Sequence, residues 1–247
     1  MPIVTELDPR RLADAKAAYT TARVDFADAV TLIAGADVRP AAGDVMLAQV
    51  LQTGHHKKLE LQTSRRAALF AGDEVLVCCG DRYAPDQFEA EICRDLGECD
   101  LVAAGGVAAC VLSRHDATRK PTRLRPVGLL GDATGRPINL ARYALPQVPH
   151  PKTAAVVAVL GASMNAGKTT AAASLVHGLG RAGLRVGAAK VTGTGAGGDL
   201  WLMADAGAYP ALDFTAAGVP STYKLPFPEV ERVFRTLTGA LMAAGAD

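Results

Sequence analysis

Residues 156–170 read Val-Val-Ala-Val-Leu-Gly-Ala-Ser-Met-Asn-Ala-Gly-Lys-Thr-Thr. The apolar run 156–160 has the length and β-branched content of a buried parallel strand. A loop of small residues follows at 161–167, and the Ala-rich pattern that starts at Lys168 predicts a helix running through Leu179. A strand, a glycine-containing loop, Lys-Thr and a helix, in this order, predict a phosphate-binding loop.

Each part of this loop has its own chemical reason. Small residues let backbone N–H groups approach a polyphosphate closely, and the start of the helix adds unpaired N–H groups and the positive end of its dipole. Lys168 is the expected cation for the β- and γ-phosphates, and the Thr169 hydroxyl is the expected ligand of Mg²⁺. We therefore predict ATP and Mg²⁺ as cofactors, although the base stays open. The residues expected to bind the nucleotide are Ala162, Ser163, Met164, Asn165, Ala166, Gly167, Lys168, Thr169 and Thr170.

A second candidate segment follows the predicted helix. Residues 186–191 are expected to form a strand parallel to the first, joined to it by a right-handed crossover. The Gly-rich loop 192–199 leaves the carboxyl end of that strand, where open α/β sheets bind ligands. We predict that Lys190, together with Lys168, offsets charge on a transferred phosphoryl group, with a plain surface lysine as the alternative. Asp199 is a candidate for Mg²⁺ or its water shell.

These two segments resemble a known family. The loop from Gly161 to Thr169 resembles that of dethiobiotin-synthetase-like P-loop proteins, which belong to the class of MinD-type ATPases and nitrogenase iron proteins. Lys190-Val-Thr-Gly-Thr-Gly195 is similar to that family's Lys-Pro-Val-x-x-Gly segment, in which the lysine faces the γ-phosphate and the substrate. The resemblance covers residues 154–247 and implies a homodimer with the substrate near the subunit interface. Ser163 stands where the synthetase has a metal-associated Asp, and Val191 replaces the Pro. The resemblance therefore supports nucleotide binding but not the specific synthetase reaction.

Composition narrows the class of protein. A chain of 247 residues has room for two modest domains. The net charge of +1 gives no electrostatic reason to expect nucleic acid or an anionic membrane as a partner. No apolar run approaches the ~20 residues of a membrane span, and the start of the chain has no signal pattern, so we predict a cytoplasmic protein. The cysteines number 5, which is odd, and no disulfide framework is expected.

The predicted fold class is α/β, divided into four parts. Residues 1–42 are expected to form an N-terminal helical arm. Residues 43–145 show short apolar runs between Gly, Asp and Pro, which predict a small antiparallel barrel or sandwich. Residues 146–152 form a Pro-rich linker. Residues 153–247 form the P-loop domain.

Two loops of the β domain hold side chains that could contact a ligand. Residues 55–58, His-His-Lys-Lys, read as a basic hairpin tip, for which a solvated turn is the favoured interpretation. Residues 82–89 form a polar and aromatic loop, suited to a ligand, to an interdomain contact or to a structural turn.

A P-loop domain needs a further strand that ends in Asp or Glu beside the phosphate loop. We expect this strand after Asp247, so that residues 153–247 are a truncated domain and the chain is the front part of a longer protein. The predicted function is ATP- and Mg²⁺-dependent activation of a small-molecule carboxylate or similar group by phosphoryl transfer, with the substrate unknown. The alternatives are a nucleotide-dependent switch whose β domain docks a partner protein, and an inactive relic.

Overall fold

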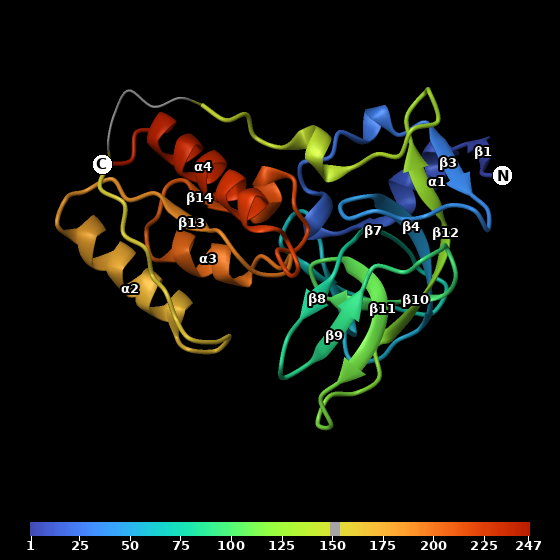
Figure 1. Cartoon of the computed structure of the whole chain (residues 1–247), viewed down its shortest axis with the longest axis horizontal. Helices are drawn as coiled ribbons and strands as arrows, with labels where there is room; N and C mark the ends of the chain where they lie inside the picture. The colour runs from blue at the N-terminus through green and yellow to red at the C-terminus, as the bar shows by residue number, and fades with distance from the viewer. Residues whose placement is uncertain (149–153) are drawn as a thin grey trace.

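The structure is a computed structural model that describes residues 1–148 and 154–247. It has two lobes, with the strands of the N-terminal part on the right of Figure 1 and the helices of the C-terminal part on the left. Residues 146–148 of the predicted linker have irregular backbone, and its residues 149–152 lie outside the described residues.

Hydrogen bonds between the strands of the N-terminal lobe close into a ring. β4 (Val45–Gln52) lies between β7 (Glu74–Cys79) and β12 (Thr122–Gly131). β11 (Val107–Arg114) pairs with β7, and β10 (Cys99–Ala103) joins β11 to β12. Within this ring the β7–β11 pairing is parallel and the others are antiparallel. The mostly antiparallel arrangement predicted for residues 43–145 is thus observed, with the strands closed into a barrel.

Both faces of β4 are buried. Met46, Ala48 and Val50 point into the core inside the barrel, whereas Val45 and Leu47 point into a second core outside it. Because successive side chains of a strand alternate between faces, burial of both faces produces the continuous apolar run seen in the sequence. Each such buried Val, Leu or Met contributes ~1.5–3 kcal/mol to folding. The N-terminal residues that share the second core include Leu7, Val24, Ala29 and Leu32.

The prediction of an N-terminal helical arm is wrong. β3 (Thr31–Ala34) pairs with β12, β1 (Ile3–Glu6) pairs with β3, and β2 (Lys16–Ala17) pairs with β7. The helical pieces are α1 (Pro9–Asp14) and the single turns η1 (Tyr19–Thr21) and η2 (Phe26–Asp28). Local helix propensity is a weak preference, and burial of Leu32 and Ile33 against the barrel overrides it.

Two hairpins and a turn complete this lobe. β5 (Lys58–Glu60) pairs with β6 (Arg66–Ala68), and β8 (Arg82–Tyr83) pairs with β9 (Phe88–Glu91). β9 also joins β11. The turn η3 (Leu140–Tyr143) leads towards the C-terminal lobe.

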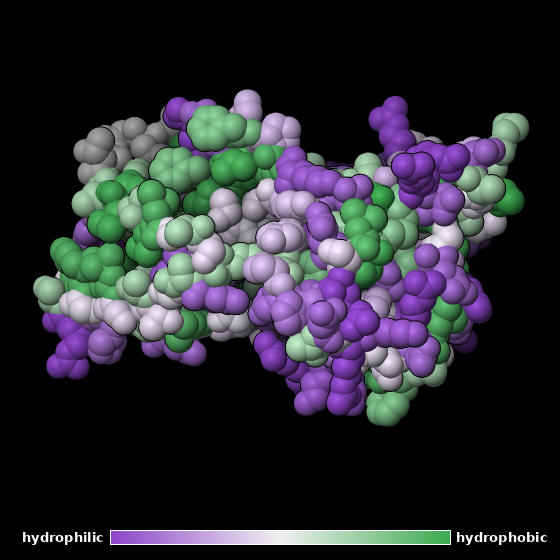
Figure 2. Space-filling model, turned by 60° about the horizontal axis from the view of Figure 1, so that its bottom comes forward, coloured by the Kyte–Doolittle hydropathy of each residue, from purple (hydrophilic) through white to green (hydrophobic). Residues whose placement is uncertain are grey.

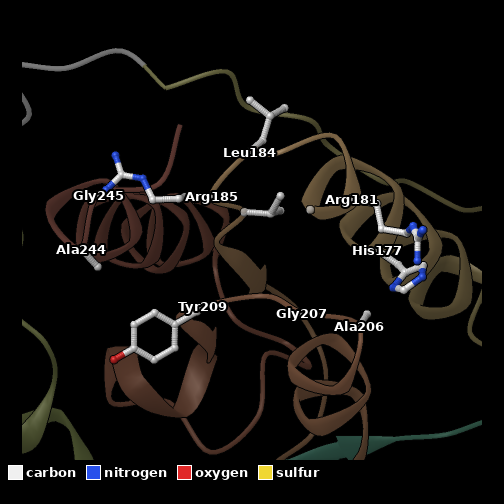
Figure 3. A pocket seen from close by; sticks show the side chains of 11 residues that line it. His177, Arg181, Leu184, Arg185, Ala206, Gly207, Tyr209, Ala244 and Gly245 are labelled. Atoms are coloured by element: carbon white, nitrogen blue, oxygen red, sulfur yellow. The ribbon is translucent and has the colours of Figure 1, made fainter.

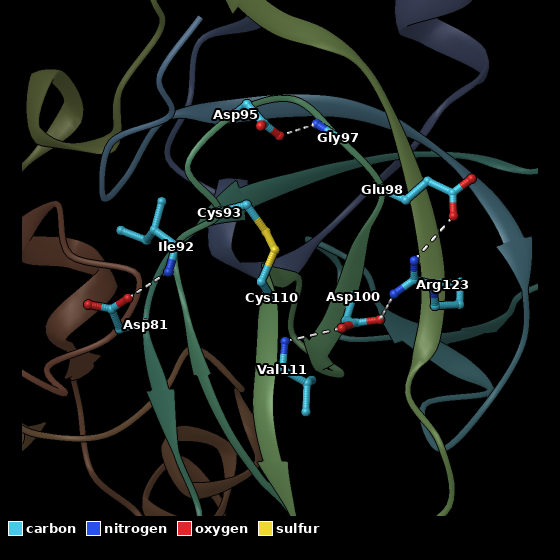
Figure 4. The surroundings of a disulfide bond; sticks show 10 residues. All are labelled: Asp81, Ile92, Cys93, Asp95, Gly97, Glu98, Asp100, Cys110, Val111 and Arg123. Atoms are coloured by element: carbon cyan, nitrogen blue, oxygen red, sulfur yellow. Dashed lines mark hydrogen bonds and ion pairs between the residues drawn. A yellow bond between two sulfur atoms is a disulfide. The ribbon is translucent and has the colours of Figure 1, made fainter. Parts of the chain in front are cut away.

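A disulfide bond corrects the expectation drawn from the cysteine count. Cys93 and Cys110 are bonded, with their Cα atoms 5.3 Å apart, and the bond ties the segment after β9 to β11 (Figure 4). Cys78, Cys79 and Cys99 are free and buried. Burial raises the pKa of Cys78 and of Cys99 to about 12, so these thiols stay protonated at neutral pH.

The C-terminal lobe has a small sheet surrounded by helices. Its strands β13 (Ala188–Lys190) and β14 (Ala211–Asp213) pair in parallel, and α4 packs against both. The helix α4 (Phe227–Ala243) is amphipathic, and its buried face includes Val233, Leu237 and Leu241. The helical elements of the lobe are α2 (Lys168–Arg181), α3 (Gly198–Asp205), η4 (Phe214–Ala217) and α4 (Phe227–Ala243).

The strand predicted at residues 156–160 is not formed. This segment has no regular secondary structure, and its apolar side chains are exposed, 64% for Val157 and 87% for Leu160. A strand needs a hydrogen-bonded neighbour, and β13 pairs with β14 instead. The expected parallel pairing of residues 156–160 with residues 186–191 is therefore not seen among the described residues, and β13 and β14 are the parallel strands of this lobe. Figure 2 shows that apolar surface gathers on this lobe, at the left of the view.

Candidate nucleotide site

The predicted phosphate-binding loop ends at a helix start, as expected. Residues 161–167 form an exposed loop, and Gly167 precedes the first residue of α2 with φ at 81°. Asn165 also has a positive φ, 63°. Both residue types tolerate this left-handed conformation better than others do, so the local sequence suits the tight turn into the helix.

Hydrogen-bond donors at the start of α2 are free. No side chain caps the helix, and within the described parts of the chain the backbone N–H groups of Lys168, Thr169 and Thr170 have no partner. The Lys168 ammonium donates to the Ser163 carbonyl and forms no ion pair with a described carboxylate. The start of a long helix and a lysine thus present positive charge to one loop, which is the arrangement that binds anions.

Lys190 and Asp199, both predicted for the site, lie together. Lys190 ends β13, Asp199 is in the first turn of α3, and their side chains form an ion pair. Gly193 has φ at 153°, a backbone conformation that residues with a side chain rarely adopt, so the loop favours glycine there. Among the described residues no hydrogen bond or ion pair joins this pair to Lys168 or Thr169. The structure therefore gives two clusters, one at the start of α2 and one at the end of β13.

The sequence did not reveal Asp213 as a neighbour of this site. Asp213 ends β14 directly opposite Lys190. Its carboxylate accepts hydrogen bonds from the Tyr19 hydroxyl at 2.8 Å and from the Thr215 N–H at 2.9 Å. Burial raises the pKa of Asp213, and burial followed by the charge of Asp213 raises that of Tyr19. The sequence signal for this position is the short run Ala211-Leu-Asp213, two apolar residues followed by Asp. A run of this length is too short to predict a strand that ends at a functional site.

The Gly-rich loop after β13 is pressed against the barrel. The N–H of Gly197 donates to Glu60 Oε2 at 3.2 Å. A Cβ on Gly105 would lie 2.2 Å from the Gly195 carbonyl oxygen, and one on Gly195 would lie 2.3 Å from Thr20 Cγ2. Such approaches exclude any side chain. The loop predicted to face a ligand thus forms a large part of the contact between the lobes.

The two loops singled out in the β domain also meet. Arg82 donates to Gln87 Oε1 at 2.7 Å and approaches His56 Nε2 at 3.3 Å, while its buried Nε atom has no partner among the described residues. Burial, and next the charge of Arg82, lower the pKa of His56 to about 3. Tyr83 stacks on Tyr223 of the C-terminal lobe. The loop 82–89 therefore makes an interdomain contact, one of the roles considered for it.

Open hollows lie away from these clusters. One, of about 420 Å³, is lined by His177, Arg181, Arg185 and Tyr209 (Figure 3). Val186, which precedes β13, also lines it, so the hollow lies at the end of β13 opposite Lys190. Another, of about 460 Å³, lies on the barrel beside Gly54. Neither is lined by a residue predicted for the nucleotide site. In residues 1–148 and 154–247 no three His, Cys, Asp or Glu side chains are grouped as metal ligands.

No family model, curated protein or solved structure matches this chain. The class of protein is therefore argued from the geometry alone. Among the described helices, none combines the length and the apolar character required to cross a membrane.

Proposed function

We propose that the C-terminal lobe is a P-loop nucleotide-binding unit that binds ATP with Mg²⁺ and activates a small-molecule carboxylate or similar group by phosphoryl transfer. The observation that carries this proposal is the uncapped start of α2. There the free N–H groups of residues 168–170 and the Lys168 ammonium, which lacks a carboxylate partner among the described residues, converge on a loop of small residues. Such a site suits the charge and the size of a polyphosphate.

The Lys190–Asp199 ion pair supports the second half of the proposal. A triphosphate with its cation can divide this pair, because the phosphate replaces Asp199 beside Lys190 and the cation replaces Lys190 beside Asp199. The Thr169 hydroxyl, which has no hydrogen-bond partner in the described part of the chain, would also hold the cation. Bound Mg²⁺ would neutralise the charge that develops on the transferred phosphoryl group. Lys190 would then face the γ-phosphate and Lys168 the β- and γ-phosphates.

Calorimetric titration with ATP and with ADP, each in the presence and absence of Mg²⁺, tests the proposal. We expect Lys168→Ala to weaken ATP binding by about 100-fold or more, because it removes a cation that contacts the phosphates directly. The matched control is Lys57→Ala, since Lys57 is an exposed lysine of the barrel. Circular dichroism of both variants should equal that of the wild-type protein. Unchanged affinity in Lys168→Ala would remove the basis of the proposal.

One observation favours a nucleotide-dependent switch as a second candidate. The loop that follows Lys190 contacts the barrel, so a change at Lys190 has a direct route to the other lobe. Turnover of ATP separates the candidates. Stimulation by small carboxylates or amines supports the enzyme, whereas stimulation by a protein partner alone supports the switch.

A further inference from the structure

The barrel holds the segment that joins the two members of the Lys190–Asp199 pair. This segment leaves β13 at Lys190, passes Gly195 and Gly197, and reaches Asp199 in the first turn of α3. At Gly195 a Cβ atom would lie 2.3 Å from Cγ2 of Thr20, a buried residue of the N-terminal lobe. At Gly197 the backbone N–H is bound by Glu60. The position of Asp199 relative to Lys190 therefore depends on a different domain.

Glu60 is unusual for a side chain of its charge. It is 2% exposed, and no Lys, Arg or His of the described residues forms an ion pair with it. Its backbone is fixed by a hydrogen bond from its own N–H to the Ala104 carbonyl at 2.8 Å, and its side chain accepts from Gly197. A buried carboxylate is costly unless it is hydrogen-bonded, and here the bond is made to the residue that precedes α3.

We propose that Glu60 is a positioning residue of the nucleotide site, supplied by the barrel. By accepting the Gly197 N–H, Glu60 fixes the position of the first turn of α3, which contains Asp199. It thereby fixes where the Asp199 carboxylate binds a cation once Lys190 contacts the phosphate instead of Asp199. This inference rests on the proposed nucleotide binding. The barrel then has a function in the nucleotide site. It fixes the position of Asp199, the candidate cation ligand, and within the described residues it makes no comparable contact with the loop at residues 161–167.

Adjacent glycines offer a matched pair of variants. A Cβ on Gly197 would lie 2.4 Å from Glu60 Oε1, whereas one on Gly198 has no atom within 4 Å. Gly197 has φ at −77°, so alanine there is strained by the contact and not by its backbone. Glu60→Ala removes the acceptor of the Gly197 N–H. Glu60→Gln retains an acceptor oxygen and removes the charge.

The first measurement is the ratio of the Kd for ATP without Mg²⁺ to the Kd with Mg²⁺, obtained by calorimetry. If Glu60 places Asp199, Glu60→Ala and Gly197→Ala should lower this ratio by about tenfold, while their affinity for ATP in EDTA stays within about twofold of wild type. Glu60→Gln should keep most of the wild-type ratio because the hydrogen bond remains. Gly198→Ala should keep all of it. A purely structural role of Glu60 would change both affinities together.

The second measurement needs no nucleotide. Trp201 is the single tryptophan of the chain, and its Nε1 atom lies 2.4 Å from the position that a Cβ on Gly197 would take. Its fluorescence therefore reports whether the segment is docked. Glu60→Ala should shift the emission to longer wavelength and increase quenching by acrylamide, and Glu60→Gln and Gly198→Ala should not. Gly197→Ala is not used in this measurement, because its methyl group would meet the indole itself.

The outcomes separate the two proposals. If the wild-type protein binds no ATP, the proposed function fails and the positioning role fails with it, although Trp201 still reports the docking. If ATP binds and Glu60→Ala keeps the full Mg²⁺ ratio, the positioning role alone is overturned. The same conclusion follows if Gly198→Ala lowers the ratio as much as Gly197→Ala does.

Discussion

His56 shows how a single partly buried side chain makes stability depend on pH. Burial and the neighbouring Arg82 lower its pKa from 6.5 to about 3 in the folded protein. The unfolded state therefore binds more protons than the folded state between these two values. The contribution of His56 to stability is complete above pH 6.5 and falls as the pH drops towards 3.

We therefore predict that wild type loses about 1–3 kcal/mol more than His56→Gln on going from pH 7 to pH 4, when unfolding free energies are measured with urea. Asp44 and Asp213, whose pKa values burial raises, contribute with the opposite sign but are present in both proteins. The surface residue His115, replaced by Gln, is the control. Parallel pH profiles of wild type and His56→Gln would contradict the prediction.

At the scale of elements, the barrel strands were well predicted from the sequence. The strands β4, β7, β10, β11 and β12 all lie within residues 43–145, where short apolar runs predicted a barrel or sandwich, because alternating or continuous burial leaves a strong apolar signal between turn residues. The N-terminal residues did not form the predicted helical arm because β3 pairs with β12, a partner about 100 residues further along the chain, and this pairing outweighs local helix propensity. The strand predicted at residues 156–160 is absent because an apolar sequence alone does not provide a neighbouring strand for hydrogen bonding, and β13 pairs with β14.

The disulfide gives a prediction at the same scale. Cys93 and Cys110 are 17 residues apart, and closing a loop of that size limits the unfolded chain. Reduction should therefore lower the free energy of unfolding by about 3 kcal/mol. We expect dithiothreitol to shift the urea midpoint of wild type and to leave the double variant Cys93→Ala/Cys110→Ala unchanged, since the remaining cysteines are buried thiols. A wild-type midpoint that is insensitive to reductant would contradict this.

At the scale of the whole molecule, the loop and helix start of the candidate site were predictable from the sequence, and the second cluster only in part. Residues 161–170 follow one another in sequence, so their chemistry can be read locally. Tyr19 and Glu60 reach Asp213 and Gly197 across 194 and 137 residues. No spacing rule connects such distant positions in a single sequence, and only the packing of the lobes reveals them.

The contact between the lobes gives a prediction of shape. A Cβ on Gly105 would lie 2.2 Å from the Gly195 carbonyl oxygen, which is backbone and cannot rotate away. Gly105→Ala should push the lobes apart, and we expect a larger radius of gyration in small-angle X-ray scattering. Gly178→Ala is the control, because this position in α2 is open and alanine there favours the helix by ~1 kcal/mol. An unchanged radius in Gly105→Ala would show that the loop accommodates the methyl group without separation of the lobes.

The order of synthesis follows from where the lobes touch. A ribosome adds about 5–20 residues per second, so roughly 3–14 s pass between the appearance of Leu145, where the barrel chain ends, and that of Asp213. During this interval the Tyr19 hydroxyl and the Glu60 carboxylate, both buried in the finished protein, face water or a chaperone. Because these groups are polar, water can hydrogen-bond with them until Asp213 and Gly197 arrive as their partners.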